Sequence, residues 1–171
     1  MTRRMDTSVV GEDGEGEAAG LLAGRGWTVR NLNDVVQNHP LYDLEASKDG
    51  RTINVSVKVG RSANRQIRLG SYQMLSRLAD EAFMFIFLPV QKGREIDLAA
   101  GSYELWIVPG HARHTALTAH LSYYRGDEAA ASAHSVMVKD KADTPGGRST
   151  SGAAFQHLRD NFKDAWSGLP A

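Results

Sequence analysis

Two carboxylates, a serine and a lysine gather on a short stretch of this sequence of 171 residues. Asp43 and Glu45 precede the turn Lys48-Asp49-Gly50-Arg51, while Ser56 and Lys58 follow it. Carboxylates can hold hard cations, and a lysine amine can take up or release a proton. Metal or acid–base chemistry is therefore available if the chain brings these side chains to one place.

The turn fixes which side chains meet. If Asp49-Gly50 is its centre, Asp43 lies opposite Ser56 and Glu45 lies opposite Asn54. Alternation along the strands then gives a polar face with Asp43, Glu45, Asn54, Ser56 and Lys58 and an apolar face with Leu44, Ala46, Val55 and Val57. Lys58 is one diagonal step from Asp43, about 7 to 8 Å between backbones, so the two can share a site. An ordinary amphipathic hairpin with a surface ion pair would give the same pattern.

The hydrophobic pattern predicts the elements that must position this hairpin. We expect a short helix that begins near Glu15, interleaved strands and helices after it, and a last helix capped by Ser151. Strands are predicted over Trp27 to Leu32, Tyr42 to Ser47, Thr52 to Val59, Ala82 to Val90, Tyr103 to Val108 and Ser135 to Lys139. Helices are predicted over Leu69 to Leu78, over Ala112 to Tyr124, and around Phe155, Leu158, Phe162 and Trp166.

Length and composition set wider limits. Residues 1–10 are expected to form a flexible tail and residues 11–171 a single domain, with core motifs in 11–88 and a C-terminal elaboration in 102–171. Twenty basic and twenty acidic residues leave no net charge, so nucleic-acid binding would need a local basic patch. The absence of cysteine excludes disulfides and thiolate sites and is typical of a cytoplasmic protein. No apolar run is long enough for a membrane span.

The order and spacing of several motifs resemble the PD-(D/E)XK nuclease superfamily. The motifs are Gly14-Glu15, Gly26-Trp27, Tyr42-Asp43-Leu44 and Val55-Ser56-Val57-Lys58, within about Gly11 to Leu88. The resemblance implies an α/β fold like that of restriction endonucleases and Holliday-junction resolvases. Such a fold has a mixed β-sheet flanked by helices, here with an additional C-terminal helix.

The resemblance also implies roles for particular residues. Glu15 and Asp43 would bind Mg²⁺ or Mn²⁺, the Val57 carbonyl could complete the shell, and Lys58 would place the attacking water. Ser56 stands where the family has a second strand acid, and Glu45 could supply that carboxylate instead. Glu12 and Glu17 compete with Glu15 for the helix role, and Glu15 fits the family spacing better.

Basic residues are concentrated just after the hairpin turn. The segment from Lys48 to Arg77 carries seven basic residues and one acid. Such a cluster suits a nucleic-acid backbone, although its arginines could also pair with acids such as Asp80 and Glu81. The candidate DNA-contacting residues are Lys48, Arg51, Arg61, Arg65 and Arg68.

These features together favour a metal-dependent nuclease acting on DNA in restriction, repair or recombination. DNA is the expected partner, no membrane is expected, and a homodimer is one assembly open to such a protein. The alternative is a nuclease fold whose site has decayed and which now binds nucleic acid or protein. Ser56 divides the two interpretations.

Overall fold

The computed structural model describes residues 7–35, 41–142 and 151–171 and is built on a five-stranded mixed sheet. Its strand order is β1-β2-β3-β5-β6, and only the β3–β5 pair is parallel. The strands are β1 (Thr28–Asn31), β2 (Leu44–Lys48), β3 (Arg51–Val59), β5 (Phe83–Leu88) and β6 (Glu104–Pro109). This sheet with its flanking helices confirms the predicted fold class.

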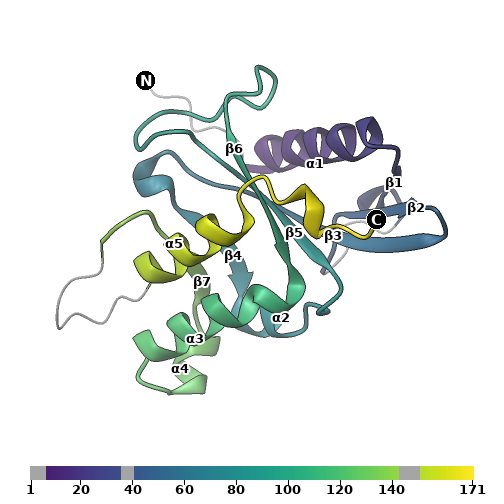
Figure 1. The fold of residues 1–171 in the computed structure, drawn as a ribbon. Coiled ribbons are helices and arrows are strands. Elements are labelled where there is room, and N and C mark those ends of the chain that lie inside the picture. The colour runs from purple at the N-terminus through teal and green to yellow at the C-terminus, as the bar shows by residue number, and fades with distance from the viewer. Residues whose placement is uncertain (1–6, 36–40, 143–150) are drawn as a thin grey trace.

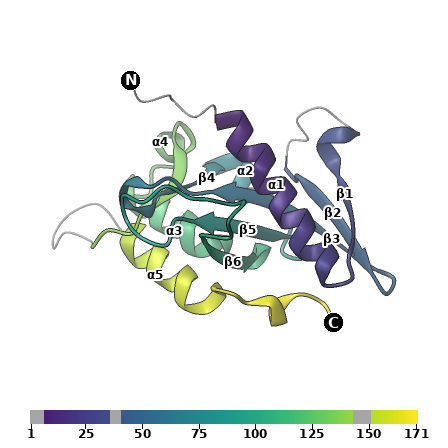
Figure 2. The ribbon, with the colours of Figure 1, turned by 90° about the horizontal axis from the view of Figure 1, so that it is seen from above.

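Alternation along β5 divides the core into two layers. Phe83, Phe85 and Phe87 face the layer under α1 (Thr7–Gly24), where Ala18 and Leu22 are fully buried. The residues between them face the other layer, which contains α2 (Tyr72–Ser76), α3 (Arg113–Tyr123) and α5 (Ser151–Phe162). Figures 1 and 2 show α1 on one side of the sheet and α3 and α5 on the other. Both faces of β5 are therefore covered, which explains its uninterrupted apolar sequence.

A second, smaller sheet was not predicted. It pairs β4 (Ile67–Ser71) with β7 (Ser135–Val138) in antiparallel fashion. The predicted helix from Leu69 to Leu78 is therefore wrong in its first part. Gly70 has a φ of +118°, and the Ser71 hydroxyl accepts the Met74 amide at 3.1 Å, so the helix begins only after Ser71. The short helix α4 (Glu128–Ser132) was also missed.

The N-terminal helix is longer than the sequence suggested. Residues 7–10, expected in the tail, belong to α1, while residues 1–6 lie outside the described part of the chain. The strands and α3 fall within a few residues of their predicted positions. None of the described helices combines the length and hydropathy that crossing a membrane requires.

The C-terminal segment belongs to both layers. Phe155 and Leu158 of α5 are buried beneath the β4–β7 side, as the helical spacing predicted. Trp166 does not continue that stripe. It lies in a separate turn, η4 (Trp166–Gly168), and packs edge-on against Phe85 in the α1 layer. Between them, the Asp164 amide donates to the Leu105 carbonyl at 2.9 Å.

Candidate active site

The hairpin has the predicted register. Leu44 pairs with Val55, and Glu45 pairs with Asn54. Leu44, Ala46, Val55 and Val57 all contribute to the core under α1. Ser56 and Lys58 instead line a cavity on the opposite side of β3, so the predicted alternation is confirmed for these residues, although most of the cavity wall is apolar.

Asp43 lies just before β2, where the ladder to β3 ends. Its amide donates to the Val55 carbonyl at 2.8 Å, and its Oδ2 atom accepts the Val57 amide at 2.7 Å. The carboxylate thus takes the place of a backbone acceptor that β2 no longer provides. Because the N–H and C=O of a strand residue point to the same side, the Val57 carbonyl also faces Asp43.

Glu15 reaches Asp43 from the middle of α1. Gly14 makes this approach close, since a Cβ atom there would lie 2.6 Å from Cγ2 of Val59. Burial raises the pKa of Glu15, and the charge and hydrogen-bonding proximity of the Asp43 carboxyl act in the same direction. Two partly buried carboxyl groups side by side form an arrangement that a proton or a cation would stabilise.

Two asparagines hold Glu15 from β1 and the turn that follows it. Asn31 donates its side-chain amide to Oε2 of Glu15, and Asn33 donates to Oε1, both at 3.2 Å. These hydrogen bonds act to lower the pKa of Glu15, against the effect of burial. Sequence reasoning missed both residues, because asparagines after a strand are typical of ordinary turns.

Lys58 lies beside a small cavity of about 80 Å³. Burial lowers the pKa of its ammonium, while the charge of Asp43 opposes that change. The structure records no ion pair within 4 Å between Lys58 and any described acidic residue. Ser56 shares the cavity and is buried, with 3% of its surface exposed. The apolar remainder of the lining is Leu41, Leu69, Met74, Leu75, Leu78 and Met84.

Glu45 makes a different contact from the one that a metal ligand would need. It forms an ion pair of 3.0 Å with Arg30 on the neighbouring strand β1. The charge of Glu45 does not shift the pKa of Glu15 or that of Lys58. Among the described residues, no group of three or more acidic, histidine or cysteine side chains is arranged to hold a metal ion. The carboxylates brought together are therefore Glu15 and Asp43.

The basic candidates lie in two places. Lys48 and Arg51 are at the hairpin tip, where Lys48 donates to the Arg25 carbonyl at 2.9 Å. Five residues of β2 separate this tip from Asp43, a span of about 17 Å. Arg61 and Arg68 follow Lys58 along the chain and are exposed.

Arg65 must be removed from the DNA-contacting set. Its side chain is only 7% exposed, and it forms ion pairs with Glu104 at 2.7 Å and with Asp140 at 3.1 Å. Arg159 and Trp106 also donate to Glu104, at 2.7 and 2.9 Å. A guanidinium buried among these partners is not available to a phosphate at the surface.

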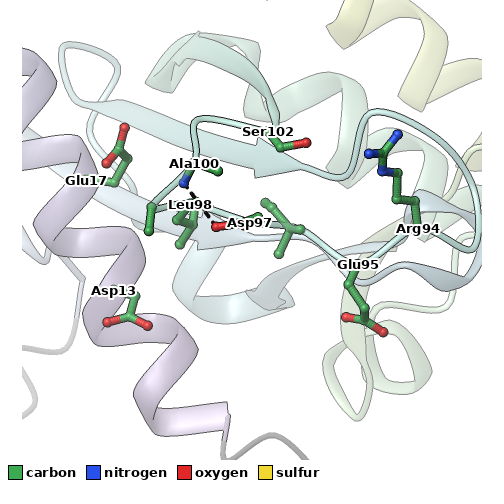
Figure 3. Close-up of a pocket in the computed structure, with 10 residues that line it drawn as sticks. Asp13, Glu17, Arg94, Glu95, Asp97, Leu98, Ala100 and Ser102 are labelled. Atoms are coloured by element: carbon green, nitrogen blue, oxygen red, sulfur yellow. Dashed lines mark hydrogen bonds between the residues drawn. The ribbon is translucent and has the colours of Figure 1, made fainter.

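A wider cavity of about 830 Å³ lies away from these residues, between α1 and the connection from β5 to β6. Asp13 and Glu17 project from α1 on one side, and residues 94–102 form the other (Figure 3). Glu95 and Asp97 join them, so four acids outnumber the single arginine, Arg94. This concentration of negative charge disfavours contact with a phosphate backbone.

Solved structures with a similar arrangement of helices and strands support the architecture described above. A bacterial homing endonuclease superposes with a TM-score of 0.52 over 95% of this chain and 89% of its own, at 15% sequence identity. The fold is nuclease-like. A Holliday junction resolvase from Archaeoglobus fulgidus gives a TM-score of 0.40 over 57% of this chain and 74% of its own, also at 15% identity. No family model matches the sequence, and no curated protein matches it either.

Proposed function

We propose that this protein is a divalent-metal-dependent nuclease that hydrolyses phosphodiester bonds in DNA. The observation that carries the proposal is the pair of Glu15 and Asp43 carboxyl groups beside Lys58. The homing endonuclease with a similar fold supports this assignment. The exposed arginines Arg61 and Arg68, close to Lys58 in sequence, are suited to contact the DNA backbone.

The donor set fits a hard cation. Glu15 and Asp43 offer carboxylate oxygens and Val57 a backbone carbonyl, and Mg²⁺ usually keeps several water ligands beside one or two carboxylates. When bound, Mg²⁺ or Mn²⁺ would neutralise charge on the scissile phosphate and support the departing oxygen. The buried Ser56 hydroxyl adds no charge, so the site relies on two carboxylates.

Side chains of the protein carry out the remaining steps of the reaction. Asp43 is fixed by the Val57 amide, which occupies Oδ2 and leaves Oδ1 without that contact. Lys58 holds the attacking water and, with its lowered pKa, can take the proton that the water loses. The apolar wall of the small cavity keeps bulk water from the amine.

The test is metal binding and cleavage in matched variants. Mn²⁺ at 100 times its dissociation constant should stabilise the wild type by about 2.7 kcal/mol, or about 5 to 10 °C in Tm. Asp43→Asn keeps an acceptor for the Val57 amide but should remove this shift and lower cleavage of plasmid and branched DNA by about 100-fold or more. Asp13→Ala, on the same helix but at the acidic cavity, should leave both unchanged. Equal cleavage after Asp43→Asn would contradict the mechanism.

A second candidate function is a DNA- or protein-binding module with a degenerate nuclease site. The buried Ser56 and the engagement of Glu45 by Arg30 favour it, because they leave the site without a third carboxylate. This candidate predicts that DNA binds without any Mn²⁺-dependent cleavage and that Asp43→Asn leaves DNA affinity unchanged. The same measurements therefore separate the two functions.

A further inference from the structure

A three-residue turn contacts both acidic residues of the proposed site, Asp43 through its backbone carbonyl and Glu15 through the Asn33 side chain. The turn is η1 (Leu32–Asp34), which follows directly on Asn31 at the end of β1. The Leu32 amide donates to the carbonyl of Asp43 at 2.9 Å, and the Leu32 side chain is buried. The backbone of the turn is therefore attached to the residue that carries one of the carboxylates.

The Glu15 carboxylate is held by one side chain of this turn and by that of the residue just before it. Asn31 and Asn33 each donate to a different oxygen of Glu15. A carboxylate oxygen has two lone-pair directions, so each Glu15 oxygen keeps one for a further partner. Rotation of the carboxylate about its terminal bond would break both hydrogen bonds at once.

The Asn31 amide is itself fixed. Its Oδ1 atom accepts the Asn33 backbone amide at 2.9 Å, so its nitrogen must be the atom that faces Glu15. Asn31, Asn33 and Glu15 thus form a closed ring of hydrogen bonds. This ring is connected through Leu32 to Asp43 and fixes the two carboxyl groups relative to each other.

We propose that Asn31 and Asn33 are positioning residues of the metal site, which hold the Glu15 carboxylate with its remaining lone pairs toward Asp43 so that both carboxylates bind one divalent cation. The inference rests on the proposed function. It assigns the asparagines a role in cation affinity, beyond that of attaching α1 to β1. Partners of this kind typically contribute 10- to 100-fold to metal affinity.

The variants follow from the geometry. Asn31→Ser keeps an acceptor for the Asn33 amide, because serine caps a helical turn as well as asparagine does, but it removes the donor to Glu15. Asn33→Ala removes the second donor and leaves the backbone amide of that position in place. Asn161→Ala is a matched control, since Asn161 is an exposed asparagine on α5 whose side chain donates to the His157 carbonyl of the same helix.

The experiment measures Mn²⁺ affinity by calorimetry on protein whose folding is checked by circular dichroism. Asn31→Ser with Asn33→Ala should weaken Mn²⁺ binding by about 10-fold or more. DNA cleavage should recover when Mn²⁺ is raised by the same factor, and the KM for DNA should stay the same. If the double variant does not fold, each single variant is measured instead, with a loss of several-fold expected.

Three results would overturn the inference, and each has a different meaning. Wild-type affinity in folded variants lacking the amide donors would refute the positioning role while leaving the proposed nuclease intact. A wild-type protein that binds no Mn²⁺ would refute both. A loss of affinity equal to that in Asn161→Ala would show a general effect of losing an asparagine and would also refute the assignment.

Discussion

At the scale of single residues, the burial of the charged Lys58 amine lowers the stability of the folded protein. Its pKa is lowered from the ordinary value of 10.5 because burial disfavours the charged amine. The folded protein therefore binds this proton less tightly than the unfolded chain does. Lys58 weakens the fold at neutral pH, and stability rises as the pH increases from the lowered pKa toward 10.5.

Replacing Lys58 tests this directly. Lys58→Met should raise the Tm of the metal-free protein at about pH 7 by about 2 °C or more, because a partly buried charge is replaced by an apolar chain of similar length. The gain should shrink at about pH 10. Cleavage should fall by about 100-fold or more. A Tm that drops at neutral pH would show that the attraction between Lys58 and Asp43 outweighs burial.

Elements far apart in the sequence are joined by Glu104. It lies in β6 and receives hydrogen bonds from Arg65, which follows β3, and from Arg159 of α5. Burial alone would raise the pKa of Glu104, but the donors Arg159 and Trp106 and the charge of Arg65 lower it below its ordinary value of 4.5. Its contribution to stability is complete above that value and is lost as the pH falls through the lowered pKa.

Glu104→Gln should therefore be strongly destabilising. Removal of the charge leaves Arg65 buried with Asp140 as its remaining acidic partner among the residues that the structure describes, and breaking a buried ion pair costs about 3 to 5 kcal/mol. Urea denaturation near pH 7 measures the loss. Arg30→Ala, which breaks the exposed pair with Glu45, is the control and should cost about 1 kcal/mol or less. Similar losses in the two variants would mean that the Glu104 network contributes little.

The elements also show what the sequence could predict. The β2–β3 hairpin follows from a turn and an alternation that lie within a few residues of each other, so its register was predicted correctly. The β4–β7 pair joins residues such as Arg68 and Ser135, whose side chains bond across 67 positions, and no local pattern specifies that partner. Asn31 and Asn33 were missed for the same reason, because their contact with Glu15 depends on how α1 packs.

At the scale of the whole molecule, a net charge of zero conceals an uneven distribution. The cavity under residues 94–102 is acidic, whereas the exposed arginines that follow Lys58 carry positive charge. Phosphate groups are attracted to one of these regions and repelled by the other. The net charge therefore does not indicate whether the protein binds nucleic acid. The arrangement of the charges indicates which surface would attract phosphate groups.

DNA binding in increasing salt tests this arrangement. Arg61→Ala with Arg68→Ala should weaken binding and reduce the slope of log affinity against log salt by about 2, because each phosphate contact contributes about 0.9. Arg94→Ala with Arg125→Ala removes the same charge from other exposed positions and should leave the slope nearly unchanged. Equal changes in the two double variants would mean that only total charge matters.

The C-terminal segment affects how this protein can associate with other chains. Its residues run beside β6, the last strand of the sheet, where Lys163 bridges to Trp106 and Asp164 bonds to Leu105. An uncovered strand edge invites pairing with a strand of another molecule, and β6 is almost wholly apolar. At the opposite edge β1 has only four residues, which offer little length for such pairing. The segment after α5 thus covers part of this edge, and we expect a shortened protein lacking it to self-associate through β6.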